Sequence, residues 1–161
     1  MSEIAYLSLG SNVGNREENL REAIRRLGTI GRITSVSGFY ETEPVEFTDQ
    51  PWFVNCTAAV EVEKTPMQLL CELLRIEQEM GRQRTQKKGP RTIDIDILLY
   101  DELVVSTADL TIPHPAMHLR RFVLEPLAEI ASETRHPVLQ KTVRELLEEL
   151  PAGQRVSRKL E

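Results

Sequence analysis

The chain has 161 residues, of which 40% are hydrophobic and 28% charged, and these values are ordinary for one soluble globular domain. Its 25 acidic residues outnumber its 20 basic residues, so the formal net charge is -5 and the sequence pI is about 5.4, which disfavours general nucleic-acid binding. No apolar run approaches the ~20 residues of a membrane span and no leader pattern opens the chain, so we expect a cytoplasmic protein without a membrane partner.

The first part of the chain predicts a strand, a helix and a second strand. Residues 4–9 alternate as in a strand, and a helix follows with Asn15 as its expected N-cap and Glu18 three residues later. Gly28 is the expected end of this helix. The segment 32–41 predicts the second strand, and the proline-rich residues that follow predict a loop. The apolar stripe of the helix is Leu20, Ala23, Ile24 and Leu27.

The middle of the chain predicts a third strand and a second helix. In residues 52–63 the side chains alternate, so Phe53 and Asn55 share one face, together with Thr57. Thr65, followed by Pro66 and Gln68, has the pattern of a helix start. The expected core face of the strand is Val54, Cys56, Ala58, Val60 and Val62, and the expected core stripe of the helix, which ends at Gly81, is Leu69, Leu73, Ile76 and Met80.

The sequence GPRTIDIDILLYDELVV, residues 89–105, predicts a fourth strand that carries two carboxylates. Side chains alternate along a strand, so Asp94 and Asp96 are expected on one face with Cβ atoms roughly 6.6 Å apart, a gap that suits a bound cation. On the same argument the isoleucines and Leu99 share the other face, and Leu98 and Tyr100 continue the aspartate face. A strand with one solvated face could also carry two aspartates only for solubility.

The predicted order of elements, βαββαβ, favours an α+β fold with a ferredoxin-like sheet. Helices would cover one face of that sheet, and the second face needs another cover or a ligand. A helix near Phe122 to Ile130, limited by Pro126, and a short helix that starts at Thr142 with Glu145 are expected to supply this cover from the C-terminal third. No linker or repeat divides the sequence, so we expect a single domain over residues 1–161.

Five cations and no acid lie between Met80 and Ile93, directly before the aspartate strand. Arginine forks match phosphate oxygens and lysines add positive charge, so this segment suits a polyanion such as a nucleoside triphosphate, although a solvated loop is the simpler interpretation. Carboxylates that hold Mg²⁺ beside arginines are typical of phosphoryl transfer. The five cations are Arg82, Arg84, Lys87, Lys88 and Arg91.

Other motifs point away from common alternatives. No G-x-x-x-x-G-K-[ST] sequence occurs, which argues against a P-loop. His114 and His118 are four residues apart, but Pro115 lies between them, so we expect phosphate contact by His114 rather than a zinc site. Cys56 and Cys71 form no C-x-x-C pair and are expected to be reduced core residues.

Five segments together resemble 6-hydroxymethyl-7,8-dihydropterin pyrophosphokinase of folate biosynthesis, a family that transfers pyrophosphate from ATP to the pterin and releases AMP. The segments are LSLGSNVGNREENL, FYETEPVEFTDQPWFVNCTAAVE, GRQR, GPRTIDIDILLYD and IPHPAMHLRRFVLEPLAEIA. The resemblance extends from about Ile4 to Ala131, and its G-P-R-T-x-D-x-D block is the most specific part.

The resemblance implies roles for individual residues. Asp94 and Asp96 would hold two Mg²⁺ ions, and Arg82 and Arg91 would stabilise charge that develops around the β-phosphate. Glu77 would bind the ribose. The other residues implied for ATP are Arg84, Lys87, Lys88, Ile97, Thr111, His114 and Arg120, and those implied for the pterin are Thr42, Glu43, Val45, Phe53, Asn55 and Phe122.

The chain departs from some family members at three positions. Lys88 stands where certain members have an aromatic residue, Asp109 where some have an arginine, and Phe53 where some have a tyrosine. The family implies small-molecule substrates, and we expect the protein to be a monomer. A non-catalytic ferredoxin-like module that binds a nucleotide is the main alternative, whereas an RNA-binding sheet would need basic and aromatic residues that are scarce here.

Overall fold

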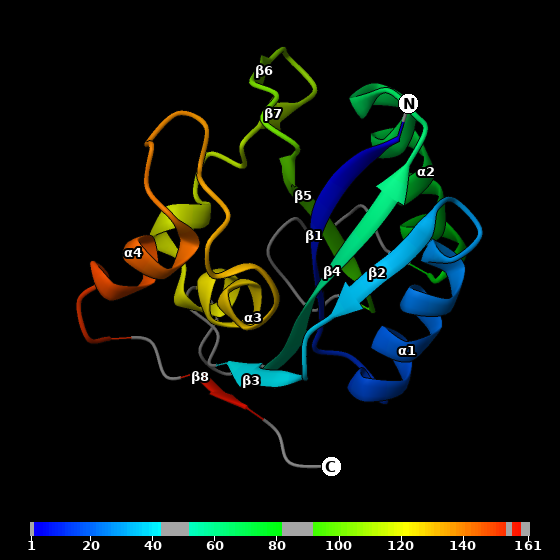
Figure 1. The fold of residues 1–161 in the computed structure, drawn as a ribbon. Helices are drawn as coiled ribbons and strands as arrows, with labels where there is room; N and C mark the ends of the chain where they lie inside the picture. Colours follow the sequence, from blue (N-terminus) through cyan, green and yellow to red (C-terminus); the bar gives the residue numbers. More distant parts are fainter. Residues whose placement is uncertain (1, 43–51, 82–91, 154–155, 159–161) are drawn as a thin grey trace.

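The computed structural model describes residues 2–42, 52–81, 92–153 and 156–158. They form an α+β structure in which every strand pairing is antiparallel. The main sheet has the strand order β5-β1-β4-β3-β8, and β2 also pairs with β4 (Figure 1). Its strands are β1 (Glu3–Ser11), β2 (Arg32–Val36), β3 (Tyr40–Thr42), β4 (Phe53–Val62), β5 (Asp94–Tyr100) and β8 (Val156–Arg158).

Helices cover both sides of this sheet (Figure 1). On one side lie α1 (Arg16–Leu27) and α2 (Pro66–Glu79), and on the other side lies α3 (Arg121–Ala131), against which α4 (Val143–Glu148) packs. A small hairpin of β6 (Val105–Ser106) and β7 (Thr111–Ile112) and a 3-10 turn, η1 (Met117–Leu119), connect β5 to α3. None of the helices in the described part of the chain has the length and apolar character that a membrane span requires.

The helix starts confirm the predicted capping residues. Asn15 accepts a hydrogen bond from the N–H of Glu18 at 3.1 Å. Thr65 and Gln68 form a reciprocal capping box at the start of α2, as Thr142 and Glu145 do at the start of α4. These local contacts fix where each helix begins, because they satisfy backbone N–H groups that have no partner within the helix.

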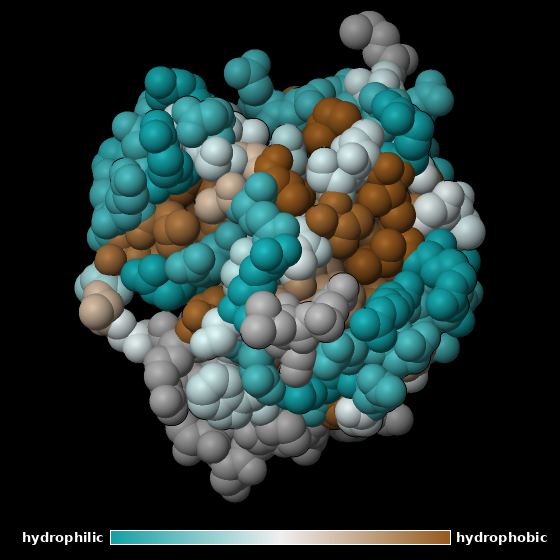
Figure 2. Space-filling view, turned by 60° about the horizontal axis from the view of Figure 1, so that its bottom comes forward, coloured by the Kyte–Doolittle hydropathy of each residue, from teal (hydrophilic) through white to brown (hydrophobic). Residues whose placement is uncertain are grey.

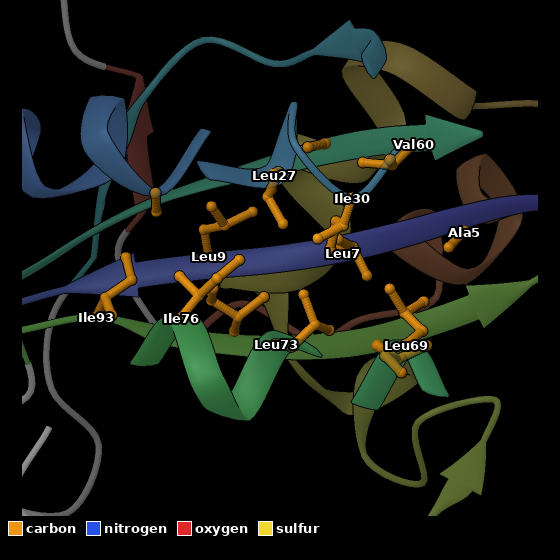
Figure 3. Close-up of a cluster of buried hydrophobic side chains, with 14 of the residues drawn as sticks. Ala5, Leu7, Leu9, Leu27, Ile30, Val60, Leu69, Leu73, Ile76 and Ile93 are labelled. Atoms are coloured by element: carbon orange, nitrogen blue, oxygen red, sulfur yellow. The ribbon is translucent and has the colours of Figure 1, made fainter. Parts of the chain in front are cut away.

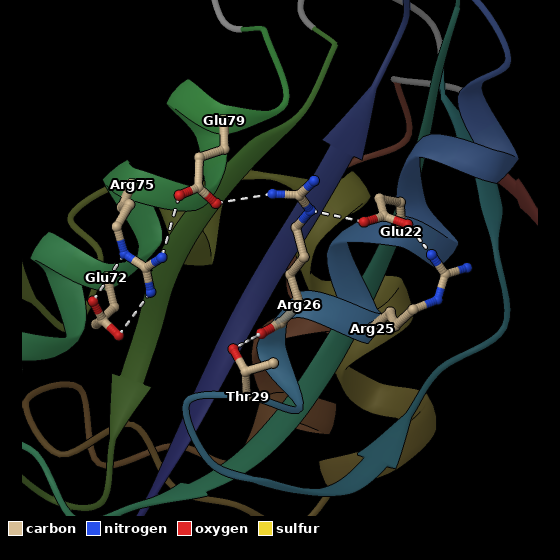
Figure 4. A network of polar contacts seen from close by, with 7 residues as sticks. All are labelled: Glu22, Arg25, Arg26, Thr29, Glu72, Arg75 and Glu79. Carbon is tan, nitrogen blue, oxygen red and sulfur yellow. Dashed lines mark hydrogen bonds and ion pairs between the residues drawn. The ribbon is translucent and has the colours of Figure 1, made fainter.

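The first core cluster lies between the sheet and helices α1 and α2 (Figure 3). The predicted stripes meet there: Leu20 and Leu27 come from α1, and Leu69 and Leu73 from α2. An ion pair between Arg26 and Glu79, 2.9 Å long, joins the two helices outside this core (Figure 4). The predicted core residues of β4 all belong to the same cluster: Val54, Cys56, Ala58, Val60 and Val62.

The second core cluster lies on the other face of the sheet. Leu98 and Leu99 of β5 pack there with Val123, Leu124 and Leu127 of α3, and α4 adds further apolar side chains. The C-terminal helices therefore bury apolar surface of the sheet that α1 and α2 do not reach. Other hydrophobic residues remain at the surface between areas of hydrophilic residues, as the face of the molecule in Figure 2 shows.

The side-chain alternation predicted for the end of β5 is wrong. Leu7 is opposite Ile97 and Tyr6 is opposite Leu99, so Leu98 is an extra residue in the ladder. Such a bulge reverses the alternation beyond it. Leu99 therefore joins the second cluster and Tyr100 the first, the opposite of the prediction.

Two other predictions need correction. The segment 32–41 is not one strand: it divides into β2 and β3, and at the break the side chain of Ser37 accepts a hydrogen bond from the N–H of Thr57 at 2.9 Å. Cys71 is exposed on α2, because two residues after Leu69 the helix has turned by about 200°. Cys56 is buried as predicted, and burial raises the pKa of its thiol to about 12.

A buried histidine makes the C-terminal region sensitive to acid. His136 Nδ1 accepts hydrogen bonds from the N–H groups of Val138 at 3.2 Å and Leu139 at 3.0 Å. Burial lowers the pKa of His136 below its ordinary value of 6.5, and positive charge on His118 lowers it further. The unfolded chain therefore binds this proton first, so the stabilisation is complete above about pH 6.5 and is lost as the pH falls below it.

We expect the melting temperature to decrease as the pH is lowered from about 7.5 to about 5.5. The decrease should be smaller in His136→Asn, because the side-chain oxygen of asparagine accepts hydrogen bonds without titrating. Thermal unfolding of both proteins across this range measures the difference. Equal pH dependence in the two proteins would show that His136 does not carry the effect.

Candidate functional site

The two aspartates lie half-buried on β5, on the face of the sheet opposite the first core cluster. Ile93, Ile95 and Ile97 belong to that cluster, which confirms the predicted alternation for this part of the strand. One residue separates Asp94 from Asp96, so their Cβ atoms lie roughly 6.6 Å apart on a common face. Two carboxylate groups therefore converge on one region of the sheet surface.

Strand β1 connects the aspartates to the polar residues of β4. Gly10 lies opposite Asp94 on one side and opposite Asn55 on the other, and Ser8 lies opposite Asp96. Residues directly opposite one another in a sheet project from the same face. Neighbouring strands are ~4.8 Å apart, so the backbones of Asp94 and Asn55 are separated by roughly 10 Å, with glycine between them.

The side chains around Asn55 form a fixed polar corner beside Gly10. Asn55 is buried, and its Nδ2 donates a hydrogen bond of 2.8 Å to Thr42 Oγ1. A Cβ atom placed on Gly10 would lie 2.5 Å from Asn55 Oδ1 and 3.6 Å from Phe53 Cδ1. The missing side chain at Gly10 thus leaves room for the Asn55 amide, and the Phe53 ring borders the same space.

The segment after β7 brings a histidine and an arginine to the aspartate side. The N–H of His114 donates to the carbonyl of Leu98 at 3.0 Å, which attaches this segment to β5. Burial lowers the pKa of His114, the Arg120 guanidinium lowers it further, and the negative charge of Asp94 opposes both effects. The Arg120 guanidinium carbon lies 5.5 Å from the centre of the Phe122 ring. Arg120 therefore lies near both His114, another predicted nucleotide residue, and Phe122, a predicted pterin residue.

Glu77 is a buried carboxylate rather than a surface one. It is 2% exposed at the end of α2, and its Oε2 accepts a hydrogen bond of 2.7 Å from the N–H of Ile95. Ile95 lies between the two aspartates. Strand β5 is at the edge of the described sheet, beside β1, so a side chain from α2 can reach its backbone. Glu77 therefore binds the backbone of the strand segment that presents both aspartates.

The remaining predicted residues lie elsewhere or outside the described ranges. Ile97 is 5% exposed in the first core cluster, and Thr111 is exposed on β7. Gly10 and Arg16 were not predicted as site residues. The sequence does carry a signal for Gly10, because a glycine in a strand often marks the close approach of another group. The predicted residues outside the described ranges are Glu43, Val45, Arg82, Arg84, Lys87, Lys88 and Arg91.

Comparison with known proteins adds sequence relatives over most of the chain. The 2-amino-4-hydroxy-6-hydroxymethyldihydropteridine pyrophosphokinase of Bacillus subtilis is 44% identical over 135 residues, which are 83% of this chain and 81% of that protein. The protein of the same name from Methylorubrum extorquens is 45% identical over 152 residues, which are 92% of this chain and 95% of that protein.

Longer proteins also contain a region similar to this chain. The folic acid synthesis protein fol1 of Schizosaccharomyces pombe is 43% identical over 153 residues, and the match covers 94% of this chain but 21% of that protein. A Plasmodium falciparum HPPK-DHPS structure aligns with a TM-score of 0.75 at 18% identity, covering 92% of this chain and 43% of that one. This chain thus spans about a fifth of the longer curated relative, and the structural likeness shows a shared fold.

The family model for 7,8-dihydro-6-hydroxymethylpterin-pyrophosphokinase matches residues 6–132. The matched region begins in β1 and ends just after α3, so it includes Gly10, Thr42, Asn55, Asp94 and Asp96. The relatives of 44% and 45% identity are aligned over 81% and 95% of their length, so the match is not confined to a short motif. The chain belongs to the 7,8-dihydro-6-hydroxymethylpterin-pyrophosphokinase family.

Proposed function

We propose that this chain transfers a pyrophosphoryl group from ATP to 6-hydroxymethyl-7,8-dihydropterin, giving AMP and the pterin pyrophosphate. The observation that carries the proposal is the row of Asn55, Gly10 and Asp94 on three adjacent strands. It places a carboxylate suited to a metal-bound phosphate and an amide suited to a heterocycle edge roughly 10 Å apart on one surface. The relatives of 44% and 45% identity carry the name of this enzyme.

The carboxylates of Asp94 and Asp96 fit the requirements of Mg²⁺, and we propose that they hold two such ions. Proteins commonly bind Mg²⁺ through one or two carboxylates, with substrate phosphates and waters as the other ligands. When bound, the ions would neutralise phosphate charge during transfer.

The nucleotide would lie along the aspartate side of the sheet. His114 Nδ1 accepts a hydrogen bond of 3.1 Å from the N–H of Ala116, so the neutral ring carries its proton on Nε2, from which it can donate to a phosphate. Arg120 adds a fixed positive charge nearby. We assign the remaining ATP contacts to Glu77, Thr111, Arg84, Lys87 and Lys88, and to the backbone of Ile97, whose side chain belongs to the first core cluster. We assign the stabilisation of charge at the β-phosphate to Arg82 and Arg91.

The pterin would lie on the Asn55 side. A flat heterocycle needs aromatic faces above and below it and hydrogen-bonding groups along its edge. Phe53 and Phe122 would supply the faces and Asn55 the edge contact, with the amide orientation fixed by Thr42. The backbone at Glu43 and Val45 would complete the recognition.

The proposal also covers the fold, the domain organisation and the state in which the protein acts. We interpret the order β5-β1-β4, with β2 and β3 both on β4, as a ferredoxin-like core, and α3 and α4 as its C-terminal cover. We further propose that residues 1–161 form one domain and that the protein acts as a cytoplasmic monomer on small molecules.

Replacing Asn55 by alanine tests the pterin assignment. The change removes the edge contact in ground state and transition state alike, so we expect the KM for the pterin to rise about tenfold or more while the KM for ATP stays within about twofold. Steady-state kinetics with each substrate varied in turn measure both values. An equal rise in the two KM values would contradict the separation of the two subsites.

Gly10→Ala tests the space beside Asn55. The φ of Gly10 is not left-handed, so we expect the added Cβ to act by displacing the Asn55 amide and to raise the pterin KM about tenfold. Gly153→Ala is the matched control, because among the described residues no atom beyond the chain neighbours lies within 4 Å of a Cβ built there. Unchanged pterin kinetics in Gly10→Ala would show that the corner is not part of the pterin site.

A further inference from the structure

Arg16 connects helix α1 to two strands beside the proposed pterin subsite. Its Nη1 donates a hydrogen bond of 3.1 Å to Glu41 Oε2 on β3 and another of 2.6 Å to the carbonyl oxygen of Trp52, just before β4. The Arg16 and Glu41 side chains are 25% and 34% exposed, so solvent only partly surrounds this contact. One guanidinium thus links three separate segments of the chain.

The position of Arg16 is unfavourable for a cation by local criteria. It is the first residue of α1, where the helix dipole favours negative charge. Arg21 and Arg25 of the same helix pair instead with glutamates of α1 itself. A cation at this helix terminus therefore gains its stabilisation from the tertiary contact with Glu41 and Trp52.

The two partners of Arg16 adjoin residues assigned to the pterin. Glu41 precedes Thr42, Trp52 precedes Phe53, and Thr42 lies opposite Phe53 in the pairing of β3 with β4. Thr42 in turn accepts the hydrogen bond that orients the Asn55 amide. A change in the relative position of the β3 end and the β4 start would therefore move the pterin side chains relative to one another.

We propose that Arg16 is a positioning residue for the pterin subsite: it holds the end of β3 and the start of β4 in the arrangement that orients Thr42, Asn55 and Phe53. The inference rests on the proposed function, since it takes Asn55 and Phe53 as pterin contacts and Thr42 as the residue that orients the Asn55 amide. Arg16 itself touches none of the proposed reacting groups in the described structure. Its loss should weaken pterin binding without affecting nucleotide binding on the other side of Gly10.

The test measures dissociation constants for two probes by calorimetry. The probes are an ATP analogue with a methylene group between its α- and β-phosphorus atoms, with Mg²⁺, and 6-hydroxymethylpterin added to the protein saturated with that analogue. For Arg16→Ala we expect the pterin dissociation constant to rise about tenfold while that of the analogue stays within about twofold. Arg16→Lys should restore part of the pterin affinity, because one ammonium cannot reproduce the geometry of the guanidinium fork.

Two further variants make the result specific. Arg25→Ala, on the same helix with a side chain that is 64% exposed, should bind both probes as the unchanged protein does. Glu41→Gln weakens the same contact from its other end and should reduce pterin affinity alone, which keeps the test valid if Arg16→Ala does not fold.

Two outcomes would overturn the positioning role of Arg16. One is unchanged pterin affinity in both Arg16→Ala and Glu41→Gln. The other is an equal loss of affinity for both probes together with a lower melting temperature, which would indicate a general structural role. Failure of the unchanged protein to bind the pterin at all would instead contradict the proposed function.

Discussion

Replacing either Asp94 or Asp96 by alanine is expected to reduce turnover by at least about 10³-fold, because metal stabilisation of a transferring phosphoryl group contributes several kcal/mol. Both carboxylates lie half-buried on the sheet face opposite the first core cluster, so their removal leaves that cluster intact. The variants should therefore remain folded. Single-turnover rates with saturating ATP, Mg²⁺ and pterin measure the loss, and circular dichroism verifies the fold.

The matched control for these variants is Glu102→Ala. This residue is an exposed carboxylate just beyond the end of β5, so its removal changes the net charge equally without touching the proposed metal site. We expect its turnover to equal that of the unchanged protein. Near-normal activity in Asp94→Ala and Asp96→Ala, or unfolding of both, would contradict the metal assignment.

Glu77→Ala is expected to reduce both stability and turnover. The N–H of Ile95 would lose its buried acceptor, which costs about 1–3 kcal/mol in the free energy of unfolding. Because Ile95 lies between the two aspartates, displacement of this backbone by about 1 Å would lower turnover by about 10²-fold. Urea denaturation and single-turnover rates measure the two effects.

Two other glutamate variants separate the contributions of Glu77. Glu77→Gln retains a side-chain oxygen that can accept from Ile95, so it should keep most of the stability. It should weaken ATP binding, because the proposed contact with the ribose loses its negative charge. Glu79→Ala, on the same helix with exposed ion pairs, should cost less than about 1 kcal/mol and leave turnover unchanged. Equal stability losses in Glu77→Ala and Glu79→Ala would show that the contact with Ile95 contributes little.

Features that depend on neighbouring residues could be predicted from the sequence. The N-caps at Asn15, Thr65 and Thr142 involve residues only three positions apart, and each has the expected hydrogen bond. The alternation of β4 likewise identified the core face from Val54 to Val62. Both features depend only on residues that are close together in the sequence, so the pattern of residue types was enough to predict them.

Features that depend on the pairing of strands could not be predicted in this way. The bulge at Leu98 arises from the register between β1 and β5, and it reversed the predicted faces of Leu99 and Tyr100. Strand β8 was not predicted, because its three residues are a strand only through their pairing with β3. The register is the alignment of two paired strands, so the sequence of one strand does not determine it.

The same distinction applies to the site. Asp94, Asp96, Asn55 and Phe53 could be proposed from alternation and family resemblance, and the structure adds how β1 connects them. Gly10 becomes informative only when a Cβ at that position is found to meet the Asn55 amide. Likewise, the carboxylate of Glu77 proves buried because α2 ends beside β5.

The most direct test of the proposed function is a product assay with ATP, Mg²⁺ and 6-hydroxymethyl-7,8-dihydropterin. The account predicts AMP and pterin pyrophosphate in equal amounts, no ADP, and no reaction when either the pterin or Mg²⁺ is left out. ADP as the product would contradict pyrophosphoryl transfer, and binding of both substrates without any turnover would instead support a non-catalytic nucleotide-binding module.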